Sequence, residues 1–87
     1  MNLNRQRIAL AVAQGQRTYR QLAATCGVAY STVTHHLNVL LMQDIVTWQG
    51  GDKGTLRLGS KAVVVRHKGE IVEVMKGEVV ENELGSS

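Results

Sequence analysis

The chain has 87 residues, enough for one small domain whose thin hydrophobic core a partner subunit could complete. Its single Cys excludes an internal disulfide and suits a reducing compartment, and no apolar run approaches the roughly 20 residues that span a bilayer. We therefore expect a cytoplasmic protein. With one Trp, two Tyr and no Phe, its core must be built mainly from Leu, Val, Ile and Ala.

The net charge of +3 conceals an uneven distribution. Residues 1–68 contain nine Lys or Arg against two Asp, which leaves +7, whereas residues 69–87 contain one Lys against five Glu, which leaves −4. A basic region of this kind suits a polyanion such as nucleic acid. The alternative is a mixed, solvated surface.

The first predicted element is a helix over residues 3–14. Ile8 and Val12 recur there at helical spacing, with Leu3 and Ala11 close to the same face. The glycine that follows is a plausible C′ residue for this helix.

A second helix is expected to start after Thr18, whose hydroxyl can cap the first turn while Gln21 completes a weak capping box. The chain then turns sharply at Gly27, where a positive φ is expected. A third helix follows from Ala29 or Tyr30 to about residue 43, unless Ser31 caps a later start. Its inward stripe is expected to consist of Val33, Leu37, Leu40 and Leu41.

Two helices around a tight glycine turn are the pattern of a helix-turn-helix, whose second helix usually lies in the DNA major groove. The third helix has no Arg or Lys, so we expect Ser, Thr and His side chains to read the bases and neighbouring elements to supply the charge. His36 is expected to be partly buried. The candidate DNA-binding residues are Arg17, Thr18, Arg20, Tyr30, Ser31, Thr32, Thr34, His35, Asn38, Lys53 and Arg57.

Several of these residues could instead be ordinary surface residues with no role in DNA binding. The hydroxyl residues Ser31, Thr32 and Thr34 could be solvent-facing filler on a helix. The basic residues Arg17 and Arg20 could be ordinary surface charges, and a lysine in a loop could serve only solubility.

Two β-prone runs, 45–49 and 55–58, flank the Gly-rich loop 50–54, which is a hairpin signal. In this position the hairpin is interpreted as a wing. Lys53 at its tip and Arg57 on its return strand could reach phosphates.

The remaining residues contain an eight-residue repeat, in which a Lys-Gly pair precedes each of two Val-rich segments. We favour strands at 62–67, 70–75 and 78–81. The alternative is a helix over 61–76, which Gly69 and the valines would weaken. The expected organisation is therefore a DNA-binding domain over 1–60, a C-terminal extension over 61–84 that could mediate dimerisation, and a disordered tail at 85–87.

Residues 22–40, LAATCGVAYSTVTHHLNVL, resemble the helix-turn-helix of bacterial ArsR- and MarR-type regulators, and the spacing to Ile45-Val46 and the Gly-rich wing is also similar. The resemblance covers roughly residues 3–58. It implies an α+β winged helix-turn-helix and DNA binding. The sequence departs from the pattern at Asp44, where such proteins commonly carry Gly, although Asp tolerates left-handed geometry. LexA-like repressors and small phage or fimbrial regulators share the same core.

Metal, redox and enzymatic functions are disfavoured. The candidate ligands Cys26, His35, His36 and His67 are unlike a zinc site, which usually has about four clustered ligands, because adjacent histidines point to different helix faces. Cys26 is expected to pack as a small hydrophobe. We find no nucleophile elbow, no catalytic carboxylate pair and no phosphate-binding glycine loop, and we expect no cofactor and no enzymatic activity.

The sequence therefore predicts a sequence-specific DNA-binding regulator, a repressor acting as a homodimer on a pseudo-palindromic site. The alternative is a winged-helix module that binds protein rather than specific DNA. The absence of Arg and Lys from the third helix and the five Glu near the C-terminus motivate that alternative.

Overall fold

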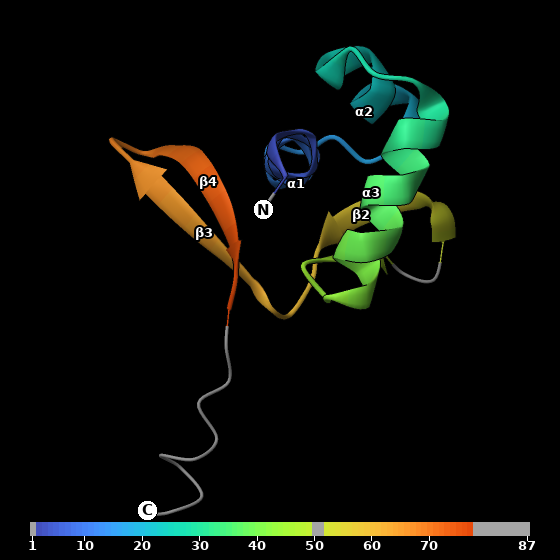
Figure 1. Ribbon diagram of the computed structural model, residues 1–87. Helices are drawn as coiled ribbons and strands as arrows, with labels where there is room; N and C mark the ends of the chain where they lie inside the picture. The colour runs from blue at the N-terminus through green and yellow to red at the C-terminus, as the bar shows by residue number, and fades with distance from the viewer. Residues whose placement is uncertain (1, 50–51, 78–87) are drawn as a thin grey trace, which may run out of the picture.

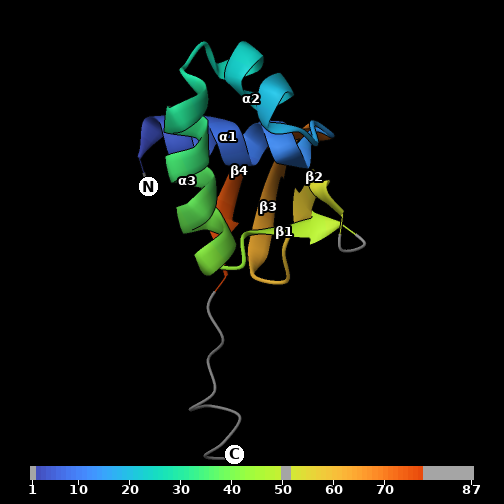
Figure 2. The same ribbon diagram turned by 90° about the vertical axis from the view of Figure 1, so that its right-hand side faces the viewer.

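The computed structural model describes residues 2–49 and 52–77, with the side chains of residues 52–54 outside the description. Three helices are followed by two antiparallel hairpins, as Figures 1 and 2 show in perpendicular views. The elements are α1 (Leu3–Ala13), α2 (Tyr19–Cys26), α3 (Tyr30–Met42), β1 (Val46–Gln49), β2 (Asp52–Leu58), β3 (Ala62–His67) and β4 (Glu70–Lys76).

Helix α1 lies between the β3–β4 hairpin on one side and α2 and α3 on the other (Figure 1). It also contacts β2. Ile8 and Ala9 are fully buried, and Ala11 and Val12 nearly so, because neighbours cover α1 on several sides. Leu3, expected near the inward face, is instead 66% exposed in the first turn.

The predicted turn between α2 and α3 is confirmed. Thr18 and Gln21 form a full capping box at the start of α2, and Gly27 ends the helix in the left-handed conformation with a φ of 65°. Helix α3 begins at Tyr30, so Ser31 lies inside it rather than at its cap. On its inward stripe the first three residues, Val33, Leu37 and Leu40, are fully buried, whereas Leu41 is half-buried.

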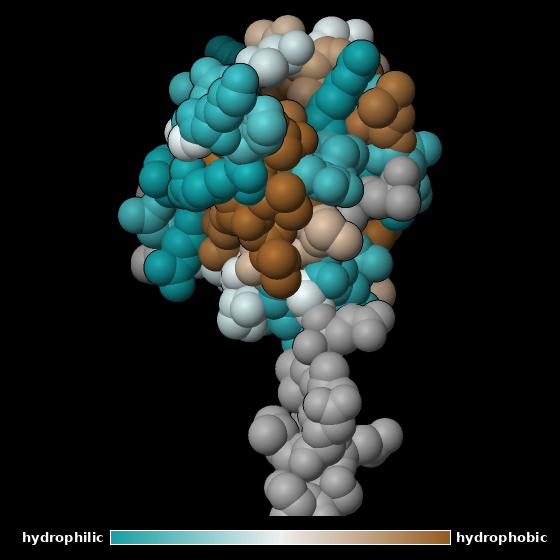
Figure 3. Space-filling model, turned by 90° about the vertical axis from the view of Figure 1, so that its left-hand side faces the viewer, coloured by the Kyte–Doolittle hydropathy of each residue, from teal (hydrophilic) through white to brown (hydrophobic). Residues whose placement is uncertain are grey.

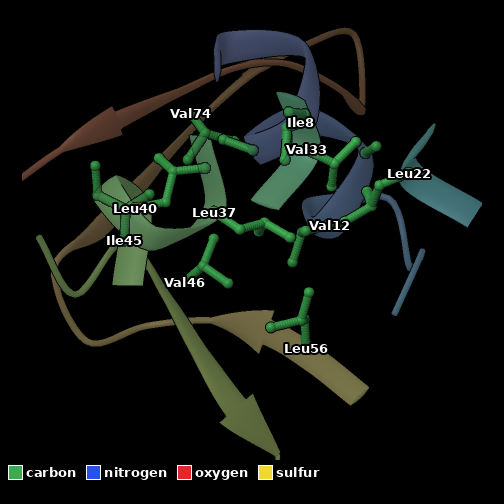
Figure 4. Packing of buried hydrophobic residues seen from close by; sticks show 12 residues of the cluster. Ile8, Val12, Leu22, Val33, Leu37, Leu40, Ile45, Val46, Leu56 and Val74 are labelled. Carbon is green, nitrogen blue, oxygen red and sulfur yellow. The ribbon is translucent and has the colours of Figure 1, made fainter. Parts of the chain in front are cut away.

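The core is aliphatic, as the composition required. Side chains from all three helices, the first hairpin and β4 converge on it (Figure 4). Its fully buried members include Ile8, Leu22, Val33, Leu37, Leu40, Ile45, Val46, Leu56 and Val74.

Strands β1 and β2 form the predicted wing. Val46 pairs with Leu58 and Trp48 with Leu56, and an irregularity follows at Gln49. The second strand begins at Asp52, three residues earlier than predicted. The backbone N–H of Leu56 also donates to the carbonyl of Arg17 at 2.9 Å, which ties the wing to the segment before α2.

Asp44 joins the wing to the second hairpin. Its φ of 57° confirms the left-handed turn, and its carbonyl accepts from the backbone N–H of Lys61 at 3.0 Å. The hydroxyl of Ser60 donates to its carboxylate. Gly59 packs so closely against this turn that an added Cβ would lie 2.2 Å from the carbonyl oxygen of Asp44.

The C-terminal extension forms the hairpin β3–β4, so the alternative helix over 61–76 is wrong. Its two-residue turn takes positive φ at both Lys68 (52°) and Gly69 (84°), the geometry that matches strand twist. Val74 is fully buried, and its backbone forms two hydrogen bonds, of 2.9 and 2.8 Å, with the side-chain amide of Gln6 on α1. The predicted strand 78–81 and tail 85–87 lie outside the described residues.

Gly59→Ala should lower the free energy of unfolding by about 1–3 kcal/mol, because its methyl group would be forced against the backbone of Asp44. Ser60→Ala is the matched control. It removes only an exposed hydrogen bond at the same junction and should cost less than about 1 kcal/mol. Urea unfolding of both variants measures the difference, and equal stabilities would contradict the close packing at Gly59.

Candidate nucleic-acid interface

Helix α3 presents a polar face to solvent. Tyr30, Ser31, His35 and Asn38 are exposed, and they fall on one side of the helix opposite its buried stripe. Thr34 is half-buried on this face, and its hydroxyl donates to the carbonyl of Tyr30 at 3.0 Å.

Not all predicted readers are equally accessible. Thr32 is half-buried, at the border between the polar face and the core. Met42, at the end of α3, is 87% exposed, an apolar side chain that sequence reasoning did not single out. Met42 lies four residues after Asn38, and this spacing could have placed it on the same exposed face of the helix.

The start of α3 is open. Ala29 is its N-cap, and no side chain within the described residues caps it. The first backbone N–H groups of a helix point outward and carry partial positive charge, which favours anions such as phosphate. A helix without basic side chains can therefore still attract a phosphate at this end.

Basic side chains flank α3, but they differ in what they contact. Arg20 on α2 and Arg57 on β2 are exposed. Arg17 is also exposed, but its Nη1 donates to Oε1 of Gln49 at 2.6 Å and to the carbonyl of Leu56 at 3.1 Å. It therefore connects to the wing, a role that its sequence position did not indicate.

Two further predicted residues need separate comment. The hydroxyl oxygen of Thr18 accepts from the N–H of Gln21 at 3.1 Å and so serves the helix cap. Lys53 belongs to β2, and its side chain lies outside the part of the chain that the structure describes.

The three aromatic residues of the chain gather beside this face. The Tyr19 ring lies parallel to Trp48, with an interplanar angle of 2° and ring centroids 5.8 Å apart. Its centroid is also 5.7 Å from that of Tyr30. Burial raises the pKa of Tyr19, and the neighbouring Tyr30 adds to that effect. Neither Tyr19 nor Trp48 was a sequence candidate; the rarity of aromatic residues was the one available signal.

His36 turns away from the polar face and is 7% exposed, more buried than expected. Its Nδ1 accepts a hydrogen bond from Nε of Arg5 at 3.3 Å, which requires a neutral ring at that nitrogen. Burial lowers the pKa of His36, and Arg5 and His35 lower it further. The buried imidazole thus connects α1 to α3 through Arg5.

The buried imidazole predicts acid sensitivity. Because the pKa of His36 is lower in the folded protein than in the unfolded chain, the unfolded chain binds more protons at pH values just below the ordinary pKa of about 6.5. The free energy of unfolding is therefore highest above about pH 6.5 and falls as the pH drops below that value. The loss should be on the order of 1 kcal/mol for each unit of pKa lowering. Thermal unfolding at about pH 7.5 and about pH 5.5 measures it.

His36→Gln removes the titrating ring and should reduce this pH dependence. His67→Gln, which changes an exposed histidine at the end of β3, should retain the pH dependence of the parent. The prediction fails if His36→Gln loses as much stability on acidification as the parent protein.

The metal-ligand candidates are not brought together. Among residues 2–49 and 52–77, no three of His, Cys, Asp and Glu lie close enough to hold a metal ion. Cys26 is half-buried against the core, and its burial raises the pKa of the thiol, although Arg7 partly opposes this. A raised pKa keeps a thiol protonated and weakly reactive.

An exposed polar helix after a tight turn, followed by a two-stranded wing, defines a winged helix-turn-helix domain of the DNA-binding class. The family described as "Bacterial regulatory protein, arsR family" matches residues 3–47, and the chain belongs to this family. It is a DNA-binding transcription regulator. Neither a curated protein nor a solved structure gives a significant match.

The family match ends inside β1, so β2 and the β3–β4 hairpin lie beyond it. None of the helices in the described residues is long and apolar enough to cross a membrane.

Proposed function

We propose that this protein is a cytoplasmic transcriptional repressor that binds a specific double-stranded DNA site with α3 in the major groove. The wing contacts the phosphate backbone beside that groove. Occupying a site is enough to block transcription from it, so repression needs no activity beyond DNA binding. The role requires neither a cofactor nor catalysis.

The exposed polar face of α3 is the observation that carries this proposal. It offers hydroxyl, imidazole and amide groups at Ser31, His35 and Asn38, each of which can hydrogen-bond to a base edge. Asn can pair with adenine through two hydrogen bonds, and Ser is tolerant of several bases. With no Arg on α3, bidentate recognition of guanine from this helix is excluded, so we expect A·T-rich positions at the centre of each half-site.

Flanking charges supply affinity rather than specificity. Arg20 on α2 and Arg57 on β2 are both exposed, and contacts of this kind position a protein on the duplex. Displacing counterions from phosphates also makes binding fall steeply with salt.

Selection of bound sequences from random DNA should recover a conserved motif, against which variants can be measured. His35→Ala and Asn38→Ala should each weaken binding to that motif by about 1–3 kcal/mol, while binding to unrelated DNA changes little. Thr32→Ala should weaken it less, since Thr32 is partly buried. Fluorescence anisotropy with a labelled duplex measures all three.

Arg57→Ala is the matched contrast. It should weaken binding to all sequences alike and reduce the slope of log affinity against log salt by about 1. If the α3 variants bind the motif like the parent, α3 is not the reading helix. If no motif is recovered, and a protein partner is captured instead, the protein-interaction alternative replaces the proposal.

We further propose a homodimer that pairs through the outer face of the β3–β4 hairpin. Val63 and Met75 are register partners on the face opposite Val74, and they are each 46% exposed, with Val72 at 49%. Figure 3 displays the apolar patch on this side of the molecule, framed by hydrophilic residues. Because α1 separates the hairpin from α3, pairing here leaves both α3 helices uncovered for two half-sites (Figure 1).

The double variant Val63→Lys/Met75→Lys should convert the dimer to a monomer, because charges would be buried at the interface. Deleting the extension would be a poorer test, since it removes Val74 from the core. Met42→Lys is the control, as it adds a charge to an exposed apolar position on α3 and should remain dimeric. Light scattering measures the mass; a monomeric parent, or a dimeric double variant, contradicts this interface.

A further inference from the structure

The aromatic row formed by Tyr30, Tyr19 and Trp48 links three elements that are distant in sequence. Tyr30 is the first residue of α3, Tyr19 is the first residue of α2, and Trp48 lies in the wing strand β1. Parallel rings 5.8 Å apart between centroids are an offset stack, the arrangement that aromatic pairs favour. Tyr19 is therefore in ring contact with the reading helix on one side and with the wing on the other.

A second link runs beside the first. The carbonyl of Arg17 accepts from the N–H of Leu56, and its guanidinium donates to Gln49 and to the carbonyl of Leu56. These bonds connect the residues just before α2 to both strands of the wing. The wing is thus held by polar contacts at Gln49 and Leu56 and by the ring stack at Trp48.

The segment that carries Tyr19 is itself held by side-chain hydrogen bonds. The side-chain oxygen of Gln21 accepts from the N–H groups of Arg17 (3.0 Å) and Thr18 (3.2 Å), and Thr18 caps the helix in return. Tyr19 and Trp48 both pack against the core. The ring of Tyr19 therefore has a fixed base from which to hold the wing.

We infer that Tyr19 is a positioning residue that sets the angle between the wing and α3 before DNA arrives. This rests on the proposed function, in which α3 and the wing contact DNA together. If the wing were free, it would have to be ordered at binding, and that ordering reduces affinity. Tyr19 would thus raise the affinity for DNA without contacting DNA itself.

Tyr19→Leu keeps an apolar side chain and a good helix former but removes the stack. Its affinity for the selected motif should fall by about five- to tenfold, the scale expected when one or two additional side chains must be ordered at binding. Tyr19→Phe is the matched control, since it keeps the ring and loses only the hydroxyl, and it should bind within about twofold of the parent. Trp48→Leu, which removes the stack from the wing side, should reproduce the loss.

A double-mutant cycle separates positioning from a general loss of stability. If Tyr19 acts by holding the wing, its removal should affect affinity little once the wing no longer contacts phosphate. Tyr19→Leu should therefore lower the affinity by less than about twofold when it is introduced into Arg57→Ala. An equal loss in both backgrounds, or parental affinity of Tyr19→Leu, would overturn the inference.

A measurement without DNA keeps this inference distinct from the proposed function. Amide hydrogen exchange in β1 and β2 should accelerate in Tyr19→Leu and Trp48→Leu but not in Tyr19→Phe, because only the first two lose the stack. If the parent selects no DNA motif, the proposed function fails, and this exchange measurement alone decides whether Tyr19 holds the wing. Unchanged exchange in both Leu variants would overturn the inference.

Discussion

The structure depends on the burial of α1 from several sides. A chain of this length with so few aromatic residues cannot build two separate cores, so one aliphatic cluster has to serve every element. Ile8 and Val12 contribute α1 to this cluster, and the alanines between them let neighbouring elements approach closely. The helix-turn-helix packs on one side of α1, β2 contacts it as well, and the C-terminal hairpin covers the side opposite α3.

This central helix explains why the C-terminal extension is part of the fold rather than an appendage. An isolated two-stranded hairpin is marginally stable in water, and here β4 gains stability by burying Val74 and by pairing its backbone with Gln6. The side-chain amide of Gln6 substitutes for one residue of a neighbouring strand. The hairpin is consequently fixed on one face, while its other face stays apolar and exposed, which is the basis of the dimer that we propose.

Local signals in the sequence were sufficient for the helices, the turn and both hairpins. Gly27 and the Val33–Leu37–Leu40 spacing predicted the helix-turn-helix, because φ preference and helical periodicity are local properties. The β-branched residues and the Lys68-Gly69 pair likewise favoured strands over a helix in the extension, since glycine readily takes the positive φ of a two-residue turn.

Contacts between distant residues could not be predicted in the same way. Which partner the guanidinium of Arg17 reaches depends on where the wing lies, 32 residues later in the chain, and the bond between Arg5 and His36 depends on how α1 crosses α3. The stack of Tyr19 on Trp48 has the same origin. Composition revealed that aromatic residues were scarce, but only the tertiary structure brings all of them together at the edge of the reading face.

In the proposed function, the polar face of α3 and the wing meet DNA together. Titrating the isotopically labelled protein with its selected duplex, and following backbone amide chemical shifts, tests this most directly. We expect the largest changes over residues 30–38 and in β2 near Arg57, with the outer face of β3–β4 unchanged. Changes concentrated in the C-terminal hairpin, with α3 unaffected, would contradict the account.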